Sequence, residues 1–443
     1  MSVFEQVVNA TDEALRMAAE VPFERGIARE VLSQLTESGS ASATPRAVVL
    51  DGPRRVGKSV ALAQVLRHLR DAGAEAWYCD FTHPLLARDG LSKVADAMLG
   101  GRGARGRVFL LFDEVHEARD WAPELKLLVD NRAARIAVAD SYAATVRSGL
   151  RERGVGRVSF VSAHPLGLAE WRDLHTAAGL TTARDPYERL EECDRYLRVG
   201  GLPEAAFERG SLDRIGRRIR HDVVAQAARV DAAHVHGVRE DTDLAALLVT
   251  LIQRSGAMIT EQETAKLLDR SRPTAKHWLK ALEDTGLVWP LHRFGAAGGR
   301  APPKIYCCDP GLVAMCSIRP DETLPSRVET AVAQALRVFA ERRGGQLGFW
   351  RGRKSQEADF VYRDARSLVI VEATSGDGEL KPKALAKRAN EIGTRGAKRV
   401  WLGVAARRAV RAERDDDGAH VHIVPLHELL EALDRNDAEA LGW

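Results

Sequence analysis

The sequence predicts an α/β fold whose N-terminal domain is a layered structure with a parallel sheet. Two observations lead to this expectation. Between residues 46 and 165, short apolar runs alternate with segments of helical periodicity, and short buried strands separated by helices are typical of parallel sheets covered on both faces. In addition, a glycine-rich string at residues 52–59, GPRRVGKS, joins the first apolar run directly to the following helix.

Each element of this domain is expected from its local pattern. An amphipathic helical segment occupies residues 1–36, and a polar turn at 37–45 leads into the first strand. The expected strands are 46–51, 75–81, 108–112, 135–140 and 157–162, and the expected helices are 57–72, 91–99 and 121–131. The domain is therefore expected to extend from residue 46 to residue 165.

The string GPRRVGKS fits the phosphate-loop template G-x-x-x-x-G-K-[ST], and it lies between a strand and a helix as that loop requires. Gly52 and Gly57 permit the tight backbone that points consecutive N–H groups at phosphates, and Lys58 is expected to reach the β- and γ-phosphates. The alternative, a glycine-rich turn with an incidental lysine, does not account for the strand–loop–helix context. ATP is the expected cofactor, with contacts from Gly52, Pro53, Arg54, Arg55, Val56, Gly57, Lys58, Ser59 and Val60.

The apolar run at 108–112 ends in Asp113 and Glu114. A carboxylate at the end of a buried strand is placed to share Mg²⁺ with the hydroxyl of Ser59, and the next residue is placed to polarise the attacking water. We therefore expect Asp113 and Ser59 as Mg²⁺ ligands, and Glu114 and Lys58 as catalytic residues. Acidic residues at a helix N-terminus are the alternative, but the pairing with the phosphate loop favours the metal site.

Two further catalytic contributions are expected. The strand at 135–140 is followed by Ser141, which is expected to approach the γ-phosphate and sense hydrolysis, and ordinary loop chemistry is the competing interpretation. Phosphoryl transfer also gains from an arginine supplied by a neighbouring subunit. Arg157 is the first candidate and Arg153 the second, with an exposed surface arginine as the alternative. Such an arginine implies a homo-oligomer, and a hexameric ring is one form of it.

The pattern changes after Pro165, where strands disappear. Residues 166–245 are expected to be mostly helical. From 246 the order is helix, helix, turn, helix and β-hairpin, which predicts a winged helix-turn-helix at 246–318. A third unit with its own helices and strands follows at 319–443, and residues 1–45 form a separate helical segment at the start.

The winged-helix segment carries basic residues on two of its parts, which suits contact with DNA phosphates. Ser271 is an expected N-cap of the recognition helix. The expected DNA contacts are Arg272, Thr274, Lys276 and Lys280 on that helix and Arg293, Arg300 and Lys304 on the wing. Docking of a protein partner through the same module is the alternative. A denser arginine cluster at 214–220 is either a DNA tract or a solvated helix face.

Strings spread along nearly the whole chain carry a resemblance to one family: GPRRVGKS, FDEVHEARDW, HPLGLAEW, YLRVGGLPEA, KIYCCDPGL and EADF. The chain resembles the bacterial AAA-type ATP-binding proteins whose C-terminal half was long labelled a domain of unknown function. The resemblance implies an AAA-like core with strand order 5-1-4-3-2, a helical lid, a winged helix and a restriction-endonuclease-like C-terminal domain. That family usually has a Gly-Ser-Ser-type turn at the sensor position, whereas this chain has Ala139, Asp140 and Ser141, so only Ser141 carries over.

For the C-terminal domain, the resemblance implies the remains of a PD-(D/E)xK nuclease site, in which carboxylates on neighbouring strands hold Mg²⁺ and a lysine helps to activate water. Asp359 and Glu372 take the acidic positions, and Glu329 on the preceding helix is a third expected ligand. Two unrelated carboxylates are the alternative. The lysine position is Thr374, which is neutral, so we expect the fold without efficient cleavage. Relocated lysines that could restore cleavage are Lys381 and Lys383.

Composition narrows the class of protein. The chain is 45% hydrophobic and 29% charged, which argues against wholesale disorder, and its net charge of +3 says little about partners. The five cysteines form no C-x-x-C pair, so a structural zinc site is not expected. Their odd number and scattered positions suit the reducing cytoplasm, which is the expected location. The N-terminus lacks the pattern of a signal peptide, and no window approaches eighteen uninterrupted apolar residues, so no membrane association is expected.

These patterns together predict a Mg²⁺-dependent ATPase of the AAA type that binds DNA and couples ATP hydrolysis to DNA remodelling or translocation as an oligomer. Branched or four-way junction DNA, and with it DNA recombination, is suggested because Holliday-junction resolvases share the nuclease-like fold, which is an analogy of fold alone. Two alternatives stay open. One is a nucleotide-dependent signalling switch whose C-terminal domains bind protein, and the other is an ATP-gated nuclease, against which Thr374 argues.

Overall fold

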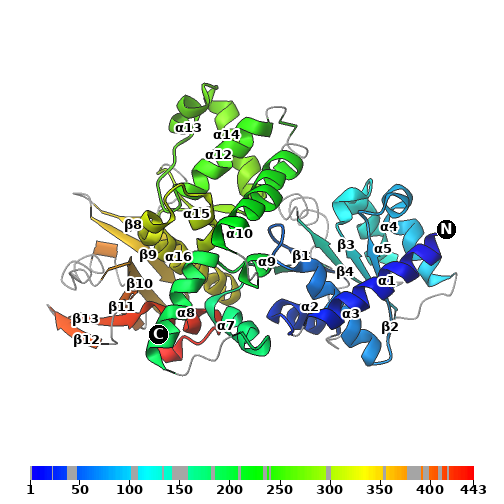
Figure 1. Ribbon diagram of the computed structural model, residues 1–443, viewed down its shortest axis with the longest axis horizontal. Coiled ribbons are helices and arrows are strands. Elements are labelled where there is room, and N and C mark those ends of the chain that lie inside the picture. The colour runs from blue at the N-terminus through cyan, green and yellow to red at the C-terminus, as the bar shows by residue number, and fades with distance from the viewer. Residues whose placement is uncertain are drawn as a thin grey trace. The chain divides into compact units, whose positions relative to one another are not determined.

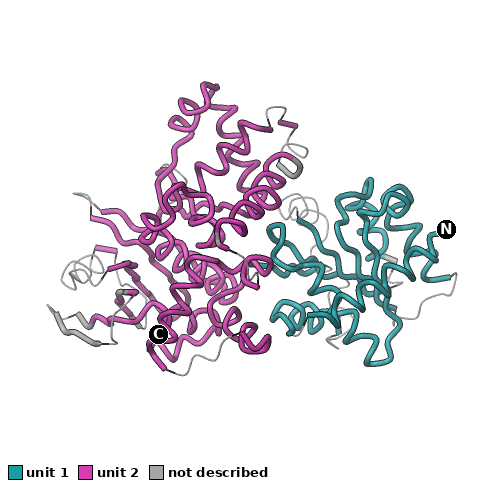
Figure 2. Tube along the Cα trace, in the orientation of Figure 1, with its two compact units in different colours: residues 1–164 teal, residues 165–443 magenta. Residues whose placement is uncertain are grey.

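The chain forms two compact units, Met1–His164 and Pro165–Trp443 (Figure 2). We describe each unit by itself. The computed structural model describes residues 2–21, 23–36, 47–100, 108–131, 134–141, 158–180, 185–207, 211–232, 237–238, 241–295, 301–352, 356–376, 391–392, 399–407, 412–416 and 419–443.

The first unit is built around a five-stranded sheet in which all neighbouring strands are parallel (Figure 1). Its strands are β1 (Ala47–Asp51), β2 (Glu75–Asp80), β3 (Val108–Asp113), β4 (Arg135–Asp140) and β5 (Val158–Ser162). Its helices are α1 (Val3–Glu20), α2 (Gly26–Thr36), α3 (Lys58–Asp71), α4 (Pro84–Leu99) and α5 (Trp121–Asn131). The strand order is β5-β1-β4-β3-β2, which confirms the expected order.

The sheet is buried because its strands carry apolar residues on both faces. All five residues of β1 are buried, and α1 packs against α3 and β2. The apolar runs end in acidic residues at the carboxyl edge of the sheet. Asp51, Asp113 and Asp140 are the last residues of β1, β3 and β4, and all three are buried. Three carboxylates therefore lie at the same edge as the phosphate loop.

One helix of this unit is longer than expected. The helix expected at 91–99 begins at Pro84 in the structure. Nδ1 of His83 caps it by accepting a hydrogen bond from the N–H of Leu85 at 3.3 Å, and proline suits the first helical position because its missing N–H has no helical partner there. The left-handed backbone of Gly90 interrupts the helix, with φ 77°. This break explains why only the second part showed a continuous helical pattern.

The second unit begins with helices that lead to a two-stranded antiparallel sheet. The helices are α7 (Leu168–Ala177), α8 (Pro186–Val199), α9 (Pro203–Ala206), α10 (Leu212–Ile219), two π-helical segments (Arg220–Ala225 and Ala227–Ala232), α12 (Asp241–Gln253), α13 (Glu261–Leu268) and α14 (Arg272–Asp284). The strands are β6 (Val288–Leu291) and β7 (Lys304–Cys307). The expected succession of three helices and a hairpin from residue 246 is present in these elements.

The second unit ends in a six-stranded mixed sheet of order β12-β13-β11-β10-β9-β8. Its elements are α15 (Pro310–Cys316), α16 (Leu324–Arg343), β8 (Gln346–Arg351), β9 (Glu357–Arg363), β10 (Ser367–Thr374), β11 (Arg399–Ala406), β12 (Ala412–Asp416), β13 (Ala419–Pro425) and α18 (Leu426–Asp434). Strand β12 was not expected, because its sequence AERDD lacks the apolar alternation from which strands are predicted.

Two further observations concern the whole chain. All five cysteines are buried and unbridged. Among the described residues, no helix combines the length and the apolar character needed to cross a membrane.

Candidate functional site

The phosphate loop is a tight turn between β1 and α3. Gly52 adopts φ 152°, and a Cβ atom at this position would lie 2.2 Å from the carbonyl oxygen of Ala163, so no larger residue fits without a shift of the backbone. Gly57, the residue before α3, adopts the left-handed conformation with φ 90°. Both glycines thus adopt backbone conformations that a tight turn requires. The loop brings the expected nucleotide contacts, from Gly52 to Val60, to the N-terminus of α3.

Lys58 lies inside the loop. Its Nζ donates hydrogen bonds to the carbonyl oxygens of Gly52 at 2.9 Å and of Pro53 at 2.8 Å, and the residue is 5% exposed. Burial lowers the pKa of the ammonium, and the charges of Glu114 and Asp113 oppose this effect. The side chain thus forms the positive centre of the site, with the acids of the sheet edge close by.

Asp113 and Ser59 come together as the sequence predicts. The carboxylate of Asp113 accepts a hydrogen bond from Ser59, and its Oδ2 accepts one from the hydroxyl of Tyr78 at 2.6 Å. Burial raises the pKa of Asp113, although both hydrogen bonds favour the charged form. A hydroxyl and a carboxylate in direct contact can bind one hard cation together. The pair therefore fits Mg²⁺, and Tyr78 is a neighbour that the sequence did not reveal.

Glu114 directly follows β3 in a left-handed conformation with φ 48°. The hydroxyl of Ser141, the residue after β4, donates to its two carboxylate oxygens at 3.3 and 3.4 Å. Burial raises the pKa of Glu114, and the charge of Lys58 opposes the rise. A raised pKa suits a carboxylate that accepts a proton. The structure thus brings together three of the four expected catalytic residues: Lys58, Glu114 and Ser141.

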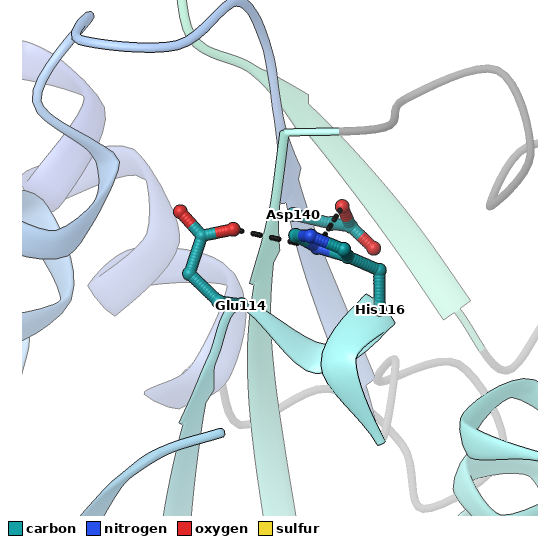
Figure 3. A group of neighbouring side chains, drawn as sticks. All are labelled: Glu114, His116 and Asp140. Carbon is teal, nitrogen blue, oxygen red and sulfur yellow. Dashed lines mark ion pairs between the residues drawn. The ribbon is translucent and has the colours of Figure 1, made fainter. Parts of the chain in front are cut away.

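His116 lies between two acidic residues, and sequence reasoning gave it no role. Its Nδ1 is 3.4 Å from Oε2 of Glu114 and 3.2 Å from Oδ1 of Asp140, and Figure 3 shows the imidazole between the two carboxylates. Burial lowers the pKa of His116, but the hydrogen bond and charge of Asp140, with the charges of Glu114 and Glu117, outweigh it and raise the pKa to about 9. A signal was available, because the expected strand order places Asp140 next to the strand that precedes His116.

The three residues Glu114, His116 and Asp140 have ligand atoms within 4.8 Å of one another, as a metal site would require. A metal ligand has to be a neutral imidazole, whereas the pKa of about 9 keeps His116 protonated near neutral pH. The ion-pair interpretation therefore fits these side chains better. In this interpretation, the His116 imidazolium forms ion pairs with Asp140 on one side and with Glu114 on the other.

Arg25, the residue before α2, forms a hydrogen bond with the backbone of the phosphate loop. The residue is 3% exposed, and its guanidinium donates to the carbonyl oxygen of Val56 and, at 3.1 Å, to that of His164. Its backbone N–H donates to Oε1 of Gln64 at 3.2 Å. One buried arginine therefore connects the loop with the segment after β5. In a sequence with many arginines nothing singled it out.

Residues 44–171 match the family described as AAA domain. This stretch contains the phosphate loop, the acidic pair and Ser141. Two later stretches match domains of unknown function, DUF8612 at residues 190–322 and DUF4143 at residues 326–429. No curated protein matches the chain in sequence.

Three solved structures illustrate the similarity of fold. The Walker-type ATPase PABY2304 of Pyrococcus abyssi has a TM-score of 0.42 and 14% identity, covering 65% of this chain and 94% of that one. The ORC1 protein of Aeropyrum pernix in complex with DNA has a TM-score of 0.30 and 14% identity, and the match covers 70% of this chain and 92% of that one. AMPPCP-bound DnaA from Aquifex aeolicus has a TM-score of 0.30 and 13% identity, and the match covers 59% of this chain and 90% of that one.

The arginines expected to act between subunits, Arg157 and Arg153, lie outside the described residues. The same holds for Arg300 and for the relocated lysine candidates Lys381 and Lys383. Among the remaining expected DNA contacts, Arg272, Thr274, Lys276 and Lys280 all belong to α14.

On α14, Ser271 caps the helix as expected and accepts a hydrogen bond from the N–H of Thr274 at 3.3 Å. Arg272 pairs with Glu261 at 2.8 Å, and Lys280 pairs with Asp284 at 2.5 Å. Both basic side chains remain largely exposed, at 72% and 60%. Two of the expected phosphate contacts are thus accessible but already bear an acidic neighbour.

The expected phosphate contact of Lys304 is wrong. The residue is 6% exposed, and its ammonium contacts Glu357 at 2.6 Å and Glu329 at 3.4 Å. It faces the C-terminal sheet because β7 lies against α16, and charged neighbours from those later elements could not be foreseen from the wing alone. Arg293 also points to this sheet, since its guanidinium donates to the carbonyl oxygen of Arg351.

The expected nuclease residues lie on adjacent elements of the second unit. Glu329 is on α16, Asp359 on β9 and Glu372 on β10. Oδ2 of Asp359 accepts a hydrogen bond from the N–H of Ala373 at 3.1 Å, which joins the ends of the two strands. Thr374 is the last residue of β10. Lys304 of the β6–β7 hairpin contacts Glu329 and Asp359, and the sequence analysis did not predict these contacts.

Proposed function

We propose that this chain is a Mg²⁺-dependent ATPase of the AAA type. The observation that carries the proposal is the contact of Ser59 with Asp113 at the sheet edge, beside Lys58 and Glu114. A hydroxyl, a carboxylate, an ammonium and a second carboxylate are the groups that phosphoryl transfer from a nucleoside triphosphate requires.

Each residue has a separate task in this proposal. Loop N–H groups from Gly52 to Gly57 bind the phosphates, and Lys58 balances charge on the β- and γ-phosphates. Ser59 and Asp113 would hold Mg²⁺, which would stabilise the charge that develops on the phosphate oxygens. Glu114 orients a water molecule and accepts its proton, and Ser141 holds the Glu114 carboxylate in place.

Calorimetry with ATP and Mg²⁺ and a steady-state ATPase assay test this proposal. We expect saturable heat with wild-type protein, and we expect Lys58→Ala to lose turnover because the positive centre of the loop is removed. Lys93→Ala is a matched control, since its side chain is 73% exposed on α4. The absence of heat with both ATP and ADP would refute the proposal.

We propose further that the second unit binds DNA, with residues 166–245 as a lid, 246–318 as a winged helix and 319–443 as a nuclease-like domain. Support comes from the exposed basic side chains of Arg272 and Lys280 on α14. Branched or four-way junction DNA is the proposed substrate, and remodelling or translocation is the proposed work of the ATPase. If this is correct, DNA stimulates ATP hydrolysis, and the stimulation falls steeply with salt.

A signalling switch that binds a protein is the second candidate, and one observation favours it. Arg272 and Lys280 each bear an acidic partner, and the hairpin faces the C-terminal sheet. Under this alternative, forked, four-way and linear DNA all leave the ATPase rate unchanged. The double variant Arg272→Ala/Lys276→Ala separates the two, because it lowers DNA stimulation only if α14 contacts DNA.

We also propose that the protein acts in the cytoplasm as a homo-oligomer in which Arg157 completes the site of a neighbouring subunit. Complementation tests this arrangement. Arg157→Ala keeps its own nucleotide site, and Lys58→Ala keeps its arginine. A mixture of the two inactive variants should recover part of the activity if Arg157 acts between subunits, and none if it does not.

For the C-terminal sheet we propose a fold without nuclease activity, since Thr374 is at the end of β10 where a nuclease would have lysine. Incubation with supercoiled plasmid and Mg²⁺ should leave the DNA intact. Nicking that disappears in Asp359→Ala would instead support the ATP-gated nuclease.

A further inference from the structure

Four charged side chains of the second unit meet where the β6–β7 hairpin adjoins the C-terminal sheet, and we call them the Lys304 cluster. Lys304 begins β7, Glu329 is on α16, and Glu357 and Asp359 are on β9. Nζ of Lys304 lies 2.6 Å from Oε1 of Glu357, 3.4 Å from Oε1 of Glu329 and 3.9 Å from Oδ1 of Asp359. One ammonium is thus surrounded by three carboxylates.

The carboxylates of the cluster are oriented by donors of the same chain. The hydroxyl of Tyr306, two residues after Lys304, donates to Oε1 of Glu329 at 2.6 Å. The N–H of Ala373 donates to Oδ2 of Asp359 and leaves its other oxygen toward Lys304. These bonds preorganise the acids around one point, and Lys304 occupies that point with its three N–H donors.

Lys304 is also fixed by its surroundings. It is 6% exposed, and its Nζ lies 5.7 Å from the ring centroid of Phe349 on β8. The loop that follows β6 is bound to the same strand, because the N–H of Phe294 donates to the carbonyl oxygen of Phe349 at 2.7 Å and the N–H of Phe349 donates to that of His292 at 3.1 Å. These contacts between the β6–β7 hairpin and β8 therefore fix Lys304 next to Glu329, Glu357 and Asp359.

Three carboxylates that converge on one point have the chemistry of a site for a hard divalent cation. Two of them, Glu329 and Asp359, are residues that the sequence assigns to a degenerate metal site. An ammonium at the same point supplies positive charge and excludes a metal, both by its position and by repulsion. The acids are 22–30% exposed at their side chains, so an ion from solvent could reach them if the lysine were absent.

We propose that Lys304 is the built-in cation of this site. Its ammonium takes the place between Glu329, Glu357 and Asp359 that a divalent metal would need, so these carboxylates bind no Mg²⁺ and instead hold the β6–β7 hairpin on the C-terminal sheet. The inference concerns the second unit only and does not depend on the nucleotide site.

The first test compares wild-type protein with Asp359→Asn in a Mn²⁺ titration without nucleotide, followed by electron paramagnetic resonance. Mn²⁺ bound in the AAA domain is common to both proteins and cancels in the comparison. We expect the same number of bound Mn²⁺ ions and the same affinity. A wild-type site that Asp359→Asn removes would overturn the proposal, whatever the behaviour of the lysine variants, and would leave the proposed ATPase untouched.

The second test uses Lys304→Met, which keeps the length of the side chain and removes its charge. We expect this variant to bind one Mn²⁺ ion more than the wild type does, and we expect Lys304→Met/Asp359→Asn to lose this additional ion. Lys280→Met is the matched control, because Lys280 pairs with one acid and its side chain is 60% exposed. A folded Lys304→Met protein without the additional ion would contradict the proposal.

Discussion

Ser141 and Glu114 are joined by a hydrogen bond of 3.3 Å between the serine hydroxyl and Oε1 of the glutamate, although they lie 27 residues apart in sequence. Each residue directly follows a strand, β4 and β3, and these strands are neighbours in the sheet. The parallel arrangement thus places a hydroxyl beside the carboxylate that is proposed to activate water.

The first prediction concerns Ser141→Ala. Removal of the hydroxyl takes away one donor that orients Glu114, and a hydrogen bond to a charged group contributes about 1.5–3 kcal/mol. We expect kcat for ATP hydrolysis to fall roughly tenfold or more, with KM for ATP nearly unchanged. Steady-state kinetics check this, and Ser141→Thr should retain most of the activity because it keeps the hydroxyl. A change in KM alone would show that Ser141 acts on nucleotide binding instead.

The second prediction concerns Glu114→Gln, which keeps the shape of the side chain but cannot accept a proton. We expect kcat to fall by about 10²-fold or more, as for the loss of a general base. ATP affinity measured by calorimetry should stay within threefold of wild type. Glu117→Gln serves as the control, since its side chain is 49% exposed in the same turn. Equal losses in both variants would point to a general effect of charge.

The third prediction concerns the phosphate loop. Gly52→Ala places a methyl group where only 2.2 Å separates it from the carbonyl oxygen of Ala163. We expect loss of measurable ATP binding and a decrease of about 1–3 kcal/mol in the free energy of unfolding, as for other overpacked sites. Gly26→Ala is the control, because a Cβ there meets nothing within 4 Å. Chemical denaturation and calorimetry report the two effects, and an unchanged ATP affinity in Gly52→Ala would be the contrary result.

The fourth prediction is a pH dependence that arises from His116. The folded-state pKa is raised to about 9, above the ordinary value of about 6.5 for an unfolded chain. The folded protein therefore binds more protons between these values, so the stabilisation is fully present below pH 6.5 and is lost as the pH rises through 9. We expect the free energy of unfolding to fall across this interval, by at most about 1.4 kcal/mol per pH unit.

The control for this pH dependence is a pair of variants. His116→Gln should flatten the decrease between pH 6.5 and 9, whereas His221→Gln should leave it as in wild type, because the side chain of His221 is 74% exposed. Urea denaturation at several pH values provides the measurement. A slope that persists in His116→Gln would assign it to other groups.

Local patterns were sufficient to predict most of the first unit. The phosphate loop is continuous in sequence, and the apolar strands differ clearly from the helices between them, so the element order followed directly. Ser59 and Asp113 could be paired because the loop and the strand end have fixed roles. The contact of His116 with Asp140 was missed. The strand order places the two segments side by side, but the contact also depends on the side-chain geometry after these strands.

Lys304 shows where such prediction fails. Its position in an apparent wing suggested exposure, and nothing in the local sequence KIYCCD indicates burial of the first residue. Its partners are contributed 25 to 55 residues later, by α16 and β9. Charged residues are rarely buried unless they are paired, and the pairing depends on tertiary contacts that no short-range pattern contains.

The Lys304 cluster also limits how this chain can be divided. The lysine belongs to residues before 319, and its three acidic partners belong to residues after it. A fragment that begins at 319 would carry the acids without their counterion, and a fragment that ends there would expose a lysine that the whole chain buries. A fragment that keeps these ion pairs therefore has to contain both the hairpin and the C-terminal sheet.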